Sequence, residues 1–318
     1  MSQKCFHFLL AACLLFPIDG YGFDKQAKTK ASSTLIKRDS AVIDANQISM
    51  VVMNNGTFGR DPMSGSGAFF FPKGTDKKLL YTAGIEIAGK VNGDIRTACA
   101  NYNVEFQPGK ILSTGVADDP DLEKYRIYKI KPGDSADPAS PNYNIDYAEW
   151  PVEDGAPVDA SGSPLILGDQ TMWLVMNDAN ESLHSGCYNT EPFNLELQLL
   201  VWAFDDESTA MGKTVFMQYT LINKSQNSIE DAYVGIWSDA DVGDSFDDAL
   251  ACDTTLDLTY AYNGDDSDMM YGTDIPAVGI CLLQGPAVPS IGETAFQFLH
   301  IPVLNARNLN MTSTSVYY

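Results

Sequence analysis

The sequence predicts an all-β protein made of one or two β-sandwich units, immunoglobulin-like or jelly-roll-like, with long acidic loops. Three observations predict this class. Several segments alternate apolar and polar residues with a period of two. Asn-Gly turn signals separate short apolar runs. No stretch keeps apolar residues at helical spacing for three turns, as an amphipathic helix would require.

The clearest strand is 215–222, where Val215, Met217, Tyr219 and Leu221 would share one face of a sheet. Gln218 and Thr220 would point to the other face. The other expected strands, in chain order, are 48–53, 79–87, 125–131, 195–203, 232–237, 256–262 and 295–304. Asn54-Asn55-Gly56 and Asn92-Gly93 lie between apolar runs and predict tight turns.

Residues 1–22 are predicted to form a secretory signal peptide. Lys4 precedes an apolar run of about a dozen residues that Pro17 ends, and small residues follow it. The run is too short for a membrane-spanning helix. Leu10-Ala11-Ala12-Cys13 also resembles a lipoprotein box, but apolar residues continue after Cys13, which favours an ordinary signal peptide. The protein is therefore expected to be secreted or on the cell surface, with lipidation of Cys13 left open.

The remaining chain divides by composition. Residues 23–40 are a flexible basic leader, and 41–131 are an N-terminal β-rich part. Pro and Gly punctuate 132–164, which we interpret as a connection. Residues 165–318 are a C-terminal β-sandwich part, and because they end in a strand-like segment we expect the natural chain to continue. Whether the body is one domain or two stays open.

The net negative charge of the chain limits the classes of molecule that it is expected to bind. The 318 residues hold 20 Lys and Arg against 42 Asp and Glu, a net charge of −22. So acidic a chain argues against nucleic acids and anionic membrane surfaces as partners. Its hydrophobic share of 45% is ordinary for a globular protein.

Four cysteines would remain after removal of the signal peptide: Cys99, Cys187, Cys252 and Cys281. An even number in an oxidising compartment favours two disulfides, with the pairing open. Cys99–Cys187 with Cys252–Cys281 would join neighbours in sequence, and four buried thiols are the alternative. His184 lies three residues before Cys187, but with so few histidines in the chain a zinc site is not favoured.

The strongest indication of a binding site is a stretch rich in aspartate. No Lys or Arg occurs between Lys224 and Arg307. Crowded carboxylates repel each other, and a bound cation relieves that repulsion. The candidate ligands are Asp239, Asp241, Asp244, Asp247, Asp248, Asp265, Asp266 and Asp268. Calcium suits them better than magnesium because it takes six to eight oxygen ligands in irregular geometry. The spacing is not that of an EF-hand, and solvated turn residues are the alternative interpretation.

Three segments resemble large, mostly uncharacterised secreted β-rich proteins of marine bacteria: 84–93, 168–173 and 233–272. Those proteins often carry an immunoglobulin-like module and a C-terminal sorting domain, which is absent here. The resemblance implies secretion and surface display and indicates no established reaction.

Catalytic motifs are weak. There is no G-x-S-x-G or H-E-x-x-H. Residues 84–90 spell G-x-x-x-x-G-K, but Val91 follows where a phosphate-binding loop has Ser or Thr. His300 lies in an apolar run and is expected to be a core residue of a strand.

We therefore expect a non-catalytic surface or adhesion-type protein with calcium-stabilised acidic loops. Its partner would be a carbohydrate or a cell-surface protein, and its oligomeric state is open. The alternative is a glycoside hydrolase, or another carbohydrate-active enzyme, with an Asp/Glu pair beside Trp150, Trp202 or Trp237.

Overall fold

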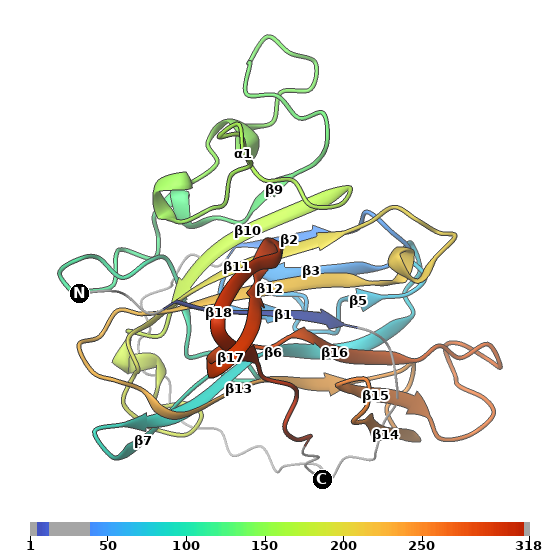
Figure 1. Cartoon of the computed structure of the whole chain (residues 1–318). Coiled ribbons are helices and arrows are strands. Elements are labelled where there is room, and N and C mark those ends of the chain that lie inside the picture. The colour runs from blue at the N-terminus through green and yellow to red at the C-terminus, as the bar shows by residue number, and fades with distance from the viewer. Residues whose placement is uncertain (1–4, 13–38, 315–318) are drawn as a thin grey trace.

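The computed structural model describes residues 5–12 and 39–314, and these are almost all β (Figure 1). No described helix reaches seven residues, and the α-helix α1 (Ile145–Ala148) has four. The all-β prediction is confirmed. No helix of the described part is long and apolar enough to cross a membrane.

One sheet contains nine of the described strands and is called sheet A here. Its order is β14 (Asp248–Asp253), β15 (Leu258–Asn263), β16 (Val278–Gln284), β1 (Cys5–Ala12), β12 (Val215–Asn223), β11 (Leu195–Ala203), β10 (Gln170–Asn177) and β8 (Gln107–Pro108). A ninth strand, β9 (Tyr128–Ile130), also pairs with β10.

A second sheet, sheet B, contains seven of the described strands. Its order is β13 (Glu230–Ala240), β6 (Lys78–Val91), β4 (Thr57–Phe58), β3 (Ser49–Met53) and β2 (Ser40–Ile43). The strand β5 (Phe69–Phe70) pairs with β3 and β6, and β7 (Asp94–Cys99) pairs with β6. A separate hairpin is formed by β17 (Ala287–Gln297) and β18 (Ile301–Asn308).

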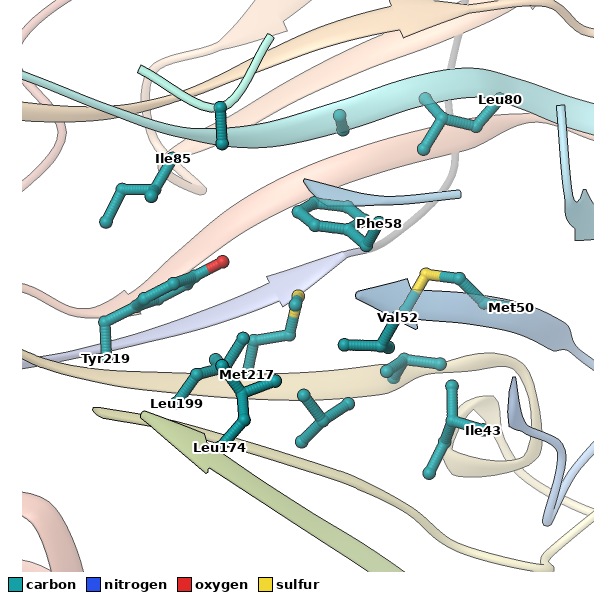
Figure 2. Packing of buried hydrophobic residues seen from close by; sticks show 14 of the residues in the cluster. Ile43, Met50, Val52, Phe58, Leu80, Ile85, Leu174, Leu199, Met217 and Tyr219 are labelled. Atoms are coloured by element: carbon teal, nitrogen blue, oxygen red, sulfur yellow. The ribbon is translucent and has the colours of Figure 1, made fainter. Parts of the chain in front are cut away.

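The main core lies between the two sheets. Met50 and Ile85 of sheet B belong to one buried cluster with Leu174, Leu199 and Met217 of sheet A (Figure 2). Burying these side chains removes apolar surface from water, which is the main force that holds the sheets together.

The outer face of sheet A is also buried along β9, β10 and β11. Trp173 and Trp202 alternate with core residues along β10 and β11 and pack with Tyr128 and Trp150. Trp150 comes from the segment 132–164, which rises above β10 in Figure 1. This segment, which the sequence predicted to be a connection, therefore also covers part of one face of sheet A.

The two β-rich parts of the chain share both sheets. In sheet B, β13 pairs with β6 over 230–240 and 80–90, and in sheet A, β9 pairs with β10. Backbone hydrogen bonds therefore link residues before 132 to residues after 164.

Most expected elements are present. The turn at Asn92-Gly93 has positive φ at both residues, 55° and 91°, and joins β6 to β7, as Asn-Gly predicts. The single strand expected over 295–304 is wrong. A 3-10 turn, Phe298–His300, separates β17 from β18, and His300 is exposed with its ring stacked 4.0 Å from that of Phe296. An apolar run can form a turn when both flanking strands supply the pairing.

The apolar run of the proposed signal peptide forms β1, which pairs with β12 and β16. Most of the proposed leader, and Cys13, lie outside the described residues. Cleavage after residue 22 stays a prediction.

Candidate functional site

Two acidic loops, 241–247 and 264–271, lie at one end of the sandwich. The first carries the chain from β13 in sheet B to β14 in sheet A. The backbone N–H groups of Asp241 and Gly243 donate to the carbonyls of Leu79 and Lys78, over 3.3 Å and 3.0 Å. The second loop follows β15, whose last residue, Asn263, pairs with Asp248 at the start of β14. Strand pairing therefore brings the two loops together.

Asp268 ties the loops to each other. Its Oδ2 accepts from the backbone N–H of Asp244 at 2.9 Å, and its Oδ1 accepts from Met270 at 2.8 Å. Gly243 has φ +78°, and a Cβ there would lie 2.2 Å from Oδ1 of Asp268. Glycine is required at this position for both reasons.

Three buried oxygens near this contact have no hydrogen-bond partner within the described part of the chain: Asp247 Oδ1, Asp248 Oδ1 and Asn263 Oδ1. Asp248 and Asn263 are each only 5% exposed. The other atoms of these groups are occupied. Asp248 Oδ2 accepts from Val242 N at 2.9 Å, and Asn263 Nδ2 donates to Asp247 Oδ2 at 3.0 Å. Buried polar atoms without partners are rare, and oxygens of this kind are the ligands that calcium prefers.

The electrostatics of the loops disfavour negative charge. Burial raises the pKa of Asp248 to about 8, and Asp241, Asp247 and Asp244 add repulsion, although the Val242 N–H opposes the shift. Burial, followed by the charge of Asp239, raises the pKa of Asp241 to about 6. A cation between the loops would remove this penalty on ionisation.

The predicted ligands do not all share this place. The Asp239 carboxylate lies outside the contact between the loops. Its Oδ2 accepts a hydrogen bond from the Tyr102 hydroxyl at 2.6 Å. Asp265 is exposed and accepts from Ser267 N at 2.8 Å, and Asp266 is also exposed. Asp241, Asp244, Asp247, Asp248 and Asp268 lie at the contact between the loops. Asp239 and Asp265 act on it from the margin, because the charge of Asp239 raises the pKa of Asp241 and that of Asp265 raises the pKa of Asp247.

Asn263 is not in the predicted ligand set, which contains only aspartates. In the described residues, only Cys99, Glu105 and Cys187 form a group of three His, Cys, Asp or Glu side chains with ligand atoms within 4.8 Å of one another. The carboxylates of the acidic loops are therefore spread more widely.

Cys99, Cys187, Cys252 and Cys281 form no disulfide bond with one another. Cys252 on β14 and Cys281 on β16 pair with opposite sides of β15. Two strand spacings separate their backbones by about 9–10 Å, beyond the roughly 7 Å that a disulfide spans. Cys99 and Cys187, in contrast, lie side by side.

The Trp residues considered for a sugar-binding cleft are mostly buried. Trp150 is 7% exposed, and its Nε1 donates to the Pro157 carbonyl at 2.9 Å. A hollow of about 580 Å³ lies beside it, lined by Glu149, Glu153 and Asp154 among others. Arg126 Nη2 donates to Glu149 Oε2 at 2.9 Å.

Sheet B carries an exposed aromatic group next to Asp239. Tyr102 is 56% exposed, and its ring meets that of Trp237 edge-on, with centroids 4.7 Å apart. Tyr81 lies 6.3 Å from Tyr102 on the other side. This group is on the surface and does not line the hollow beside Trp150.

A comparison of this chain with models of protein families, with curated proteins and with solved structures finds no match. The resemblance to secreted proteins of marine bacteria stays a prediction from its motifs. In the fold, residues 84–93 form part of β6 and its turn, 168–173 lead into β10, and 233–272 include both acidic loops. Function is therefore argued from the geometry of the sites.

Proposed function

We propose that this chain is a secreted or surface-displayed, non-catalytic β-sandwich protein whose acidic loops bind calcium. One observation carries the proposal: Asp247, Asp248 and Asn263 each keep a buried oxygen without a partner where the loops meet. Calcium coordinates carboxylate and amide oxygens at 2.3–2.6 Å and accepts additional backbone and water oxygens. If these aspartates were only solvated turn residues, their carboxylate oxygens would be exposed to water and would not be buried without partners.

Calcium at this place would stabilise the contact between the sheets. The loop 241–247 is the crossover from sheet B to sheet A, and the second loop reaches it through Asp268. A cation held by both loops would neutralise the repulsion around Asp248 and restrict the crossover. Loops held rigidly on a β scaffold are common binding surfaces.

The proposed partner is a carbohydrate or a cell-surface protein. The exposed Tyr102, packed on Trp237 and hydrogen-bonded to Asp239, supports it. Tyr and Trp are enriched at binding interfaces because they offer apolar area together with a polar group. Asp239 also links this aromatic surface to the calcium loops two residues later in the chain.

A glycoside hydrolase is the second candidate. The hollow lined by Glu149, Glu153 and Asp154 favours it, because hydrolysis needs two carboxylates beside a sugar. Against it, the ring of Trp150 is buried, and Asp154 forms an ion pair with Lys110. Hydrolysis of a panel of polysaccharides that is lost in Glu149→Gln and in Glu153→Gln would favour this candidate over the binding protein.

Isothermal titration of the chelator-treated chain with calcium tests the main proposal. We expect binding by the unaltered chain and no saturable binding by Asp248→Asn. Asp266→Asn is the matched control, because it removes an equal charge from an exposed position in the same region. Equal calcium binding by both variants would refute the proposed ligand set.

A further inference from the structure

A second group of ligand-type side chains lies on the edge of sheet B, away from the acidic loops. Cys99 is the last residue of β7, and Glu105 follows it after a short loop. Cys187 belongs to the loop between β10 and β11. The sulfurs of both cysteines and a carboxylate oxygen of Glu105 all lie within 4.8 Å of one another. His184 lies beside Glu105 at the margin of this group, with its Nδ1 3.8 Å from Oε2 of Glu105.

Backbone hydrogen bonds hold Glu105 in place. Its N–H donates to the Cys99 carbonyl at 2.8 Å, and its Oε2 accepts from the Cys99 N–H at 3.1 Å. Its Oε1 is buried and has no hydrogen-bond partner in the described residues. A fully buried carboxylate is thus fixed beside two sulfurs with one oxygen left over.

The ring of His184 is oriented by Asp178. Nε2 lies 2.8 Å from the Asp178 carbonyl, which can only accept, so Nε2 carries the proton. In the neutral ring, Nδ1 then presents a lone pair. Nδ1 is buried and lacks a partner among the described residues, and it faces Glu105 over a gap too long for a hydrogen bond.

We propose that Cys99, Glu105, His184 and Cys187 bind one thiolate-preferring divalent ion, of which zinc is the type. Zinc takes four ligands from thiolates, imidazoles and carboxylates. At bond lengths of 2.0–2.3 Å its ligand atoms are about 3.3–3.8 Å apart, within the spread of the three donor atoms here. Calcium, a hard cation, prefers oxygen ligands and would not select this group.

The surroundings fit such an ion. A metal-binding histidine commonly donates its second N–H to a carbonyl, as His184 does to Asp178. Asn101 Nδ2 donates to the Cys187 sulfur at 3.3 Å, which favours a thiolate. Cys187 is half-buried and offers a route from solvent. A Cys99–Cys187 disulfide would use both sulfurs but would leave Nδ1 of His184 and Oε1 of Glu105 without partners.

Cobalt(II) is the probe, because tetrahedral thiolate coordination gives it characteristic visible and near-ultraviolet absorption. The full chain, reduced and freed of metal, is titrated with cobalt(II) and then with zinc. We expect one cobalt per chain with a sulfur-to-cobalt band, displaced by zinc and retained in excess calcium. Cys187→Ser should abolish the band, and His184→Gln should weaken binding at least tenfold.

Cys252→Ser, an exposed cysteine elsewhere in the fold, is the control and should keep the spectrum. Asp248→Asn should keep it too, which separates this site from the proposed calcium loops. Absence of a thiolate band in the reduced, folded chain would overturn the proposal. So would a band that survives Cys187→Ser, or a protein recovered after export with a Cys99–Cys187 disulfide and no zinc.

Discussion

Replacement of Asp248 by Asn should abolish the calcium response of the protein without weakening the calcium-free fold at neutral pH. The Asp248 side chain is buried at the start of β14, and burial raises its pKa to about 8. The unfolded chain ionises this group near pH 4. Between these values the unfolded state releases a proton that the folded state keeps, so the folded state loses stability as pH rises.

The magnitude follows from the same pKa difference. Each unit corresponds to about 1.4 kcal/mol, so from pH 4 to pH 7 the penalty is at most about 4 kcal/mol. Asn cannot ionise, so in chelator Asp248→Asn should be at least as stable as the unaltered chain at pH 7. It should also show a smaller loss of stability between pH 4 and pH 8.

In calcium we expect the opposite order of stability, with the unaltered chain more stable than Asp248→Asn. An ion that binds only the folded state at 100 times its dissociation constant adds about 2.7 kcal/mol. For a folded part of this size, that is a rise of about 5 °C in the midpoint of thermal unfolding. The unaltered chain and Asp266→Asn should show this rise, and Asp248→Asn should lack it.

The assay is thermal unfolding followed by Trp fluorescence and circular dichroism, in calcium and in chelator, from pH 4 to pH 8. The reasoning fails if the midpoint of the unaltered chain does not respond to calcium. It also fails if Asp248→Asn keeps the full response, because the buried carboxylate would then not be a ligand.

Two further predictions concern stability, one concerns the pKa of Asp239, and one concerns export. Gly243→Ala should lower the free energy of unfolding by about 1–3 kcal/mol in urea denaturation because of its positive φ; an unchanged value would contradict the loop geometry. Trp173→Ala should cost about 3–5 kcal/mol in the same measurement, because its ring is fully buried against the outer face of sheet A. Tyr102→Phe should raise the pKa of Asp239 further, since the hydroxyl hydrogen bond now lowers it; carboxyl NMR titration measures this, and a lowered pKa would refute the contact. N-terminal sequencing of exported protein should begin near residue 23, and retention of 1–22 would contradict the signal peptide.

Local patterns explain what was predictable in the fold. The period-two alternation of 215–222 predicted β12, and Asn92-Gly93 predicted the turn between β6 and β7. Both depend on neighbouring residues only. The run 295–304 misled for the same reason, because its apolar composition does not reveal that the hairpin of β17 and β18 turns at Leu299.

The candidate calcium region was visible as a stretch without Lys or Arg, but its ligands were not. Asp239 carries the same side chain as Asp248, yet one accepts a hydrogen bond from Tyr102 and the other keeps a buried oxygen without a partner. Asn263 joins the group because β15 pairs with β14. These differences come from contacts with residues far away in the chain.

The sequence by itself determined the all-β class, the main strands, the turn chemistry and the concentration of negative charge. Only the tertiary structure decided that β10 and β11 are buried on both faces, that β13 joins β6, and that Cys99 meets Cys187 and Glu105. The physical reason is the distance along the chain over which each effect acts. Alternation and turn propensity act over a few residues, whereas the environment of a side chain depends on strand pairing across the whole chain.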